Sequence, residues 1–175
     1  MSISVSRFET DGRSYDFYDI GVSGPLRKRW AAAVSDPYAV IFPFDAACFG
    51  DSLWGDEGDP MNEQLMLWSS IANSQSFSRT HLIVIFTKVD KLTKALHRQS
   101  SLGAYESFFA ELPETRDDAL RGMTRKLMSL ISDPTPGQEV PRRWVSFWHA
   151  SIVESTTKMA EVAFSALEHL NQEHG

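Results

Sequence analysis

Residues 82–90 read LIVIFTKVD, and the first part, Leu82–Phe86, is an unbroken apolar run. The run is rich in β-branched residues and too short for a helix, so it predicts a buried strand. Strands of this kind belong to parallel sheets, and α/β proteins bind ligands at the carboxyl edge of such a sheet. The run therefore predicts an α/β fold in which the residues after Phe86 lie at a ligand-binding edge.

Thr87, Lys88 and Asp90 follow this run directly. A carboxylate accepts two parallel hydrogen bonds, which matches the N1–H and 2-amino group of guanine, and the stem of a lysine can lie on a flat ring. The alternative is a strand that ends in a solvated turn. Short motifs often match by chance, so these residues alone leave both interpretations open.

The composition is that of a globular protein. The chain has 175 residues, a formal net charge of −6, 42% hydrophobic and 23% charged residues, which predicts a single domain over residues 1–175. The negative charge argues against nucleic-acid binding, which needs a basic surface. The single cysteine, Cys48, favours a reducing, cytoplasmic compartment. No apolar run approaches the roughly 20 residues of a membrane helix, so we expect no direct membrane anchor.

Apolar runs alternate with amphipathic segments after an opening hairpin. The hairpin is expected in Ser2–Thr10 and Tyr15–Ile20, joined at an Asp-Gly turn. The later strands are expected at Tyr38–Phe44, His81–Phe86 and Val145–Trp148, and the helices at Leu26–Val34, Met61–Asn73, Lys91–Gln99, Asp117–Ile131 and Thr156–Asn171. This order predicts a three-layer α/β domain, with a mostly parallel sheet and helices on both faces.

Several segments at the expected strand ends carry a family resemblance. Loops follow strands in the order Asp19–Gly21, Thr87–Asp90 and His149–Ser151. The first loop ends the segment YDFYDIG at Tyr15–Gly21. It is followed by RKRW at Arg27–Trp30, EQLMLWSSIAN at Glu63–Asn73, and Phe77. Together these segments resemble the Ras-like domain of heterotrimeric G-protein alpha subunits, with the first two similar to switch II and the third to the third helix. The similarity runs from about Val5 to Leu170.

The resemblance implies a P-loop-NTPase, Ras-like fold that binds GTP or GDP with Mg2+. The nucleotide-binding positions that it implies are Asp19, Gly21, Val22, Ser23, Thr87, Lys88, Asp90 and Ala150. Asp19 would hold magnesium through a water, and Ala150 would offer its backbone N–H to the guanine O6. Thr87 stands where the family usually has Asn and keeps a hydrogen-bonding hydroxyl. The alternative for Asp19 is a carboxylate that caps the turn after its strand.

The resemblance also implies partners. Alpha subunits act in signal transduction downstream of G protein-coupled receptors, with beta-gamma dimers, receptors and effectors, in the cytoplasm or at the membrane through those partners. Arg27 and Glu63 match a pair that bridges switch II to the third helix. Trp30, beside Lys28, is an aromatic residue among basic ones, which suits a partner anchor. The alternative for Trp30 is a place in the hydrophobic core. The alternative for Arg27 and Glu63 is that they are two solvated charges, which contribute little to stability.

The chain departs from the family in the segments that contact the phosphates of the nucleotide. The 175 residues contain no G-x-x-x-x-G-K-S/T, and the chain begins at what would be the second strand. The phosphate loop, the inserted helical domain and switch I have no counterpart, and Ser23 replaces the glutamine that orients the attacking water. We expect GTP hydrolysis to be impaired or lost and assign no catalytic residue. The alternatives are a nucleotide-free interaction module that uses switch II, and a fragment of a complete alpha subunit.

The family's strand order, 2-3-1-4-5-6, implies that the strand without a counterpart lies between Tyr15–Ile20 and Tyr38–Phe44. Its loss would leave two open sheet edges with unpaired backbone groups. We expect these two strands to close up and pair directly.

Overall fold

The computed structural model describes residues 3–10, 12–20, 34, 36–48, 60–99, 109, 113–132, 145–149, 162–169 and 172. The chain divides into two compact units, Met1–Pro37 and Tyr38–Gly175. The expected single domain over residues 1–175 stays a prediction. The expected helix Leu26–Val34 lies outside the described residues except for Val34.

The first unit is an antiparallel hairpin of β1 (Ile3–Thr10) and β2 (Arg13–Ile20). Gly12 makes the turn with φ of 73°, a left-handed conformation that glycine adopts without steric cost. On one face Arg7 pairs with Asp16 at 2.7 Å, and on the other the rings of Phe8 and Phe17 meet edge to face, 5.3 Å apart. The expected hairpin is confirmed.

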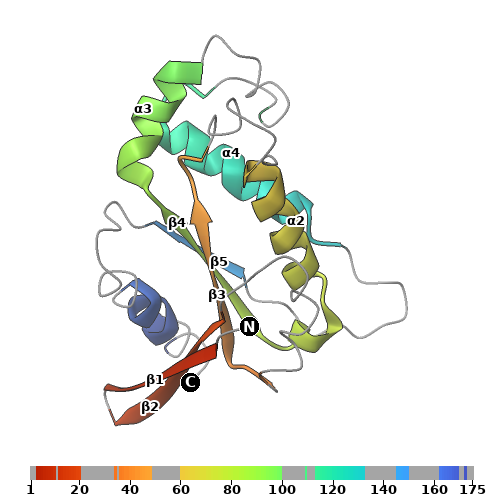
Figure 1. The fold of residues 1–175 in the computed structure, drawn as a ribbon, viewed down its shortest axis with the longest axis vertical. Coiled ribbons are helices and arrows are strands. Elements are labelled where there is room, and N and C mark those ends of the chain that lie inside the picture. Colours follow the sequence, from red (N-terminus) through yellow and green to blue (C-terminus); the bar gives the residue numbers. More distant parts are fainter. Residues whose placement is uncertain are drawn as a thin grey trace. The chain divides into compact units, whose positions relative to one another are not determined.

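The second unit holds a parallel sheet in the order β3 (Ala39–Asp45), β4 (His81–Thr87) and β5 (Val145–His149), seen in Figure 1. β4 is the central strand, and Ile83, Val84 and Ile85 are fully buried. This is the physical reason for the unbroken apolar run, because a strand covered on both faces has no polar side. The predicted buried parallel strand and the α/β class are confirmed.

Helices cover both faces of this sheet. The helices with defined bounds are α2 (Pro60–Ala72), α3 (Val89–Gln99) and α4 (Arg116–Ser129), with a short 3-10 turn, η3, at Gln75–Phe77; residues 162–169 are also helical. The ring of Trp68 on α2 lies 5.5 Å from that of Phe42 on β3. On β5, Trp148 lies 6.0 Å from His169.

These two contacts are on opposite faces of the sheet. Phe42 is in register with Val84, and Val84 with Phe147. Because side chains alternate along a strand, Trp148 projects to the other face from Phe147. Figure 1 accordingly shows α2 and the helical residues 162–169 on opposite sides of the strands. The second unit is thus built in three layers.

The expected direct pairing of the hairpin with the next strand is wrong. β1 and β2 form one sheet, and β3, β4 and β5 form another. The ladder with β1 uses one edge of β2, and β2 and β3 belong to different compact units of the chain. β3 carries Pro43, which has no N–H to donate to a ladder and is typical of an edge strand.

Candidate functional site

The carboxyl end of β4 is the best-defined part of the predicted site. Thr87 is buried, with 6% of its surface exposed. Its Oγ1 donates a hydrogen bond of 3.3 Å to the carbonyl of Phe44 on β3, and its own carbonyl accepts from the N–H of Ala46 at 3.1 Å. Thr87 therefore fastens the ends of β3 and β4 together, and its hydroxyl proton is used within the protein.

Lys88 has an unusual backbone. Its φ is 55°, in the left-handed region that residues with a side chain rarely adopt. Its carbonyl accepts from the N–H of Lys91 at 2.9 Å, which begins the first turn of α3. Conformations of this kind carry strain and concentrate at functional sites. The sharp turn places Asp90 in the first turn of α3 immediately after the sheet edge.

The side chain of Lys88 reaches across to the end of the neighbouring strand. Its Nζ forms an ion pair with Oδ2 of Asp45, the last residue of β3. The other carboxylate oxygen, Oδ1, accepts from the N–H of Ala47 at 3.0 Å. The Lys88 ammonium is thus held by the protein itself.

A residue of α2 fixes Asp45 in turn. The side-chain oxygen of Gln64 accepts from the N–H of Asp45 at 2.7 Å, and its Nε2 donates to the carbonyl of Asp45 at 3.5 Å and to Sγ of Cys48 at 3.0 Å. Asp45 and Gln64 are not among the site residues predicted from the sequence. Asp45 is the first residue after the expected strand Tyr38–Phe44, so the strand-end rule that selected Thr87 also applies to it.

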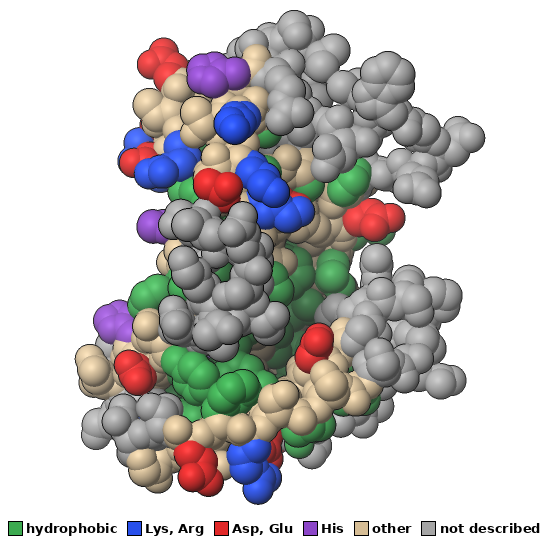
Figure 2. Space-filling model, turned by 60° about the vertical axis from the view of Figure 1, so that its left-hand side comes forward, with side chains coloured by type: hydrophobic (Ala, Val, Ile, Leu, Met, Phe, Trp, Pro, Cys, Tyr) green, Lys and Arg blue, Asp and Glu red, His purple; other side chains and the backbone are tan. Residues whose placement is uncertain are grey.

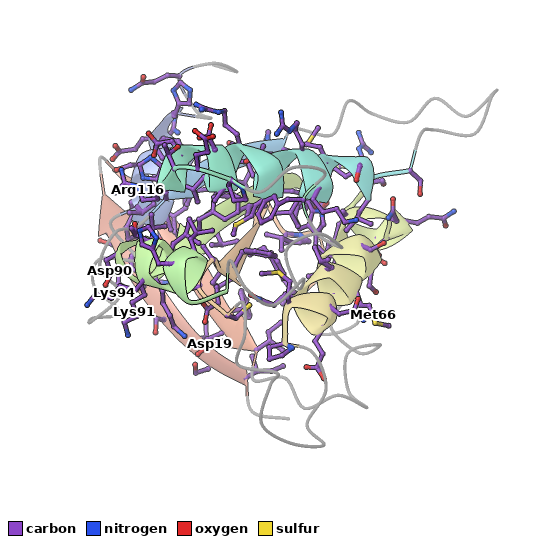
Figure 3. The ribbon with its side chains drawn as sticks, turned by 90° about the horizontal axis from the view of Figure 1, so that it is seen from above. Asp19, Met66, Asp90, Lys91, Lys94 and Arg116 are labelled. Carbon is purple, nitrogen blue, oxygen red and sulfur yellow. The ribbon has the colours of Figure 1, made fainter. Side chains whose placement is uncertain are left out.

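Asp90 is exposed, as a ligand contact requires. Its carboxylate lies in the first turn of α3, where the helix dipole favours negative charge. Figure 3 labels Asp90 beside Lys91 and Lys94 on α3, with Arg116 of α4 on the same side of the view, and all are exposed. Figure 2 shows Lys and Arg side chains interspersed with Asp and Glu side chains in the region of α3 and α4. Arg116 is paired with Asp117 at 3.3 Å, so its charge is partly compensated within α4.

The remaining predicted positions are only partly placed. Asp19 is exposed near the end of β2, in register with Ser4, and belongs to the first unit. Glu63 is exposed on α2. Seven of the predicted positions lie outside the described residues: Gly21, Val22, Ser23, Arg27, Lys28, Trp30 and Ala150. Residue 150 directly follows His149, the register partner of Phe86 on β4.

The described residues contain neither a cluster of metal ligands nor a membrane-spanning helix. No group of three or more His, Cys, Asp or Glu side chains in this part of the chain is placed to hold a metal ion. Asp19 offers one carboxylate, which suits a contact through water better than a closed metal shell. No helix in the described ranges is long and apolar enough to cross a membrane.

Comparison with known proteins defines the class. The family model described as G-protein alpha subunit matches residues 1–169. The chain therefore belongs to the G-protein alpha-subunit family.

Individual relatives agree with this assignment. The chain is 32% identical to a guanine nucleotide-binding protein alpha-2 subunit of Neurospora crassa over 55% of its own length and 27% of the relative's. It is 29% identical to an alpha-3 subunit of Caenorhabditis elegans over 77% and 40%, and 31% identical to an alpha-1 subunit of Schizosaccharomyces pombe over 54% and 24%. The chain thus spans between a quarter and two fifths of the length of these relatives.

Proposed function

We propose that this chain is a guanine-nucleotide-binding signal-transduction protein of the alpha-subunit type whose GTP hydrolysis is impaired or lost. The observation that carries the proposal is the placement of Asp90. It is exposed in the first turn of α3, three residues after the central strand of a parallel sheet. A carboxylate there is free to accept the N1–H and 2-amino group of guanine.

The proposed base contacts come from the carboxyl ends of β4 and β5. Asp90 recognises the guanine edge, the stem of Lys88 lies on the ring, and the backbone N–H of Ala150 donates to O6. Thr87 supports the loop through its bond to Phe44 and keeps lone pairs that can accept a hydrogen bond. Gly21, Val22 and Ser23 are proposed to lie near the phosphates, with Asp19 holding Mg2+ through water. The metal would neutralise phosphate charge.

The phosphate contacts are the weak part of the proposed site. In a phosphate loop, backbone amides, a lysine and a helix N-terminus hold the β- and γ-phosphates, and these supply much of the affinity. The 175 residues contain no such loop. We therefore expect this chain to bind GDP and GTP no more tightly than about micromolar.

Hydrolysis is expected to be absent for the same reason. Phosphoryl transfer is catalysed almost entirely by positioning and by stabilising charge on the phosphates. Ser23 is too short to orient a water as a glutamine does. Single-turnover assays with GTP should show no phosphate release above background, and Ser23→Gln should not restore it. Phosphate release that disappears in Asp19→Ala would contradict this part of the proposal.

The proposed partners are a beta-gamma dimer, a receptor or an effector, bound through Arg27, Lys28, Trp30 and Glu63. The proposed location is the cytoplasm, or the membrane surface through these partners. A nucleotide-free interaction module is the second candidate, and the lack of a phosphate-loop motif in the 175 residues favours it.

Calorimetry with GDP and ADP separates the two candidates. A guanine-binding protein should give a saturable heat with GDP in the micromolar range or weaker, and none with ADP. Equal heats for the two nucleotides, or none with either, would reject guanine recognition and favour the interaction module.

A further inference from the structure

We propose that Asp45 and Gln64 are positioning residues for Lys88, so that α2 fixes how this lysine is presented at the carboxyl edge of the sheet. The consequence for ligand binding rests on the proposed function. The placement of the lysine rests on the contacts described above.

The contacts form a continuous chain from α2 to Lys88. The amide of Gln64 bonds both polar atoms of the Asp45 backbone, at 2.7 Å and 3.5 Å. The Asp45 carboxylate divides its oxygens between the N–H of Ala47 and the ammonium of Lys88. The Asp45 side chain is 24% exposed and that of Lys88 47%, so the carboxylate is the sheltered, fixed partner and the lysine the adjustable one.

This arrangement determines what Lys88 offers a ligand. Its charge is compensated by Asp45, and its side chain is extended toward β3 at the same edge as Asp90. A lysine held in this way presents its apolar stem, which suits a flat base, rather than a free ammonium, which suits a phosphate. We infer that the site favours the uncharged, nucleoside end of a guanine nucleotide, and that Asp45 lowers the ordering cost of stacking on it.

The direct test is the reactivity of Lys88. Trace acetylation by acetic anhydride, read peptide by peptide by mass spectrometry, reports how far each ammonium is engaged. Asp45→Asn removes the charge but keeps an oxygen for the N–H of Ala47, so the fold should survive. Lys88 should then react about two to five times faster, the range that corresponds to a partly exposed ion pair.

Three further variants make this result specific. Asp16→Asn breaks the Arg7–Asp16 pair of the hairpin and is the matched control, with no expected change at Lys88. Asp45→Glu should restore protection, and Gln64→Ala should raise the rate by a smaller factor than Asp45→Asn. An unchanged Lys88 rate in Asp45→Asn, with the chain still folded by circular dichroism, would overturn the proposal.

Guanosine, which has no phosphate, tests the consequence for binding. Asp45→Asn should weaken guanosine binding about 3- to 10-fold, the cost of ordering one freed side chain, whereas Asp16→Asn should not. Equal guanosine affinity in the wild type and Asp45→Asn would overturn the inference about presentation. If the wild type binds no guanosine, the proposed function fails, and the acetylation rates still decide whether Asp45 and Gln64 hold Lys88.

Discussion

The indole N–H of Trp68 on α2 donates a hydrogen bond of 2.8 Å to the backbone carbonyl of Leu127 on α4. Both side chains are fully buried. The bond gives the aromatic residue of α2 a partner for its polar atom, and it joins two helices through residues that are 59 positions apart in the chain.

Trp68→Phe should lower the free energy of unfolding by about 2 kcal/mol, through the lost hydrogen bond and the smaller ring. In this variant the carbonyl of Leu127 still accepts a hydrogen bond of 3.3 Å from the N–H of Leu130, so it is not left without a partner. Urea unfolding followed by circular dichroism measures the change. Trp148→Phe is the control, because that ring is only half-buried and bonds Ser146, and it should cost less than about 1 kcal/mol. Equal losses in the two variants would contradict the interpretation.

Asn73 ties the carboxyl ends of α2 and α4 together. Its Nδ2 donates to the carbonyls of Ser69 and Leu130, both at 2.8 Å, and its Oδ1 accepts from the N–H of Ser132 at 2.8 Å. Asn73→Asp keeps the acceptor, loses both donors and places negative charge at the negative ends of two helices.

At neutral pH, Asn73→Asp should cost about 2 kcal/mol of unfolding free energy or more, and at least as much as Asn73→Ala. Thermal unfolding with a calorimeter measures both. Asn62→Ala, at an exposed position of α2, should be nearly neutral. A loss well below about 2 kcal/mol in both variants, which both lack the Nδ2 donors, would show that the donor contacts do not matter. A more stable Asn73→Asp than Asn73→Ala would show that the bond accepted from Ser132 outweighs the added charge at the helix ends.

Gly122 on α4 is in close contact with the ring of Phe109. A Cβ at position 122 would lie 2.5 Å from two ring atoms of Phe109, too close for any real contact. Gly122→Ala gains helix propensity of about 0.5–1 kcal/mol but forces a crowded core, at about 1–3 kcal/mol.

The net effect of Gly122→Ala should be destabilising by about 1 kcal/mol in chemical unfolding. Phe109→Leu in the same chain removes the ring and should recover part of the loss, so the two changes should not be additive. Additive losses would show that the Phe109 ring is not the obstacle.

The amino end of α4 carries a pH-dependent cap. Thr115 is the N-cap residue: its hydroxyl accepts from the N–H of Asp118 at 3.1 Å and donates to the Asp118 carboxylate at 2.6 Å. The hydrogen bond from Thr115, and then that from Arg121, lowers the pKa of Asp118 below its usual value. A depressed folded-state pKa stabilises the protein above the unfolded pKa, and this contribution is lost as the pH falls through the folded value.

Thr115→Val should therefore raise the pKa of Asp118 toward its ordinary value, which carboxyl-detected NMR titration measures. At neutral pH the wild type should have a higher free energy of unfolding than Thr115→Val. In acid this difference should shrink to the contribution of the hydrogen bond between the N–H of Asp118 and the Thr115 hydroxyl. A difference in unfolding free energy that does not change with pH would contradict the contribution of the Asp118 carboxylate.

The sequence predicted the features that follow from local pattern. The run Leu82–Phe86 has one explanation, burial on both faces, and β4 confirmed it. The amphipathic stripes located α2 and α4 within a residue or two, because each must bury one face. The pairing between strands was harder to predict from the sequence. The expected pairing of Tyr15–Ile20 with the next strand followed from the family's sheet order, and no local pattern in the chain encodes it.

In the candidate site, the sequence predicted where Asp90 lies in the fold but not the contacts that Lys88 makes. Asp90 was selected by its position after a strand, which the fold preserves. The engagement of Lys88 depends on Asp45, which is 43 residues earlier in the chain and close only because β3 and β4 pair in register. Gln64 joins them because α2 packs over the same edge. Such contacts depend on tertiary structure, and sequence spacing gives no signal of them.

The base preference of Asp90→Asn tests the central claim most directly. An asparagine in place of the carboxylate presents a donor where guanine also presents its 2-amino donor, whereas xanthine presents a carbonyl oxygen there. In calorimetric titrations with guanosine and xanthosine diphosphates, the wild type should prefer the guanine form and Asp90→Asn the xanthine form. A wild-type guanine preference that Asp90→Asn leaves unchanged, or no preference in either protein, would contradict guanine recognition by Asp90.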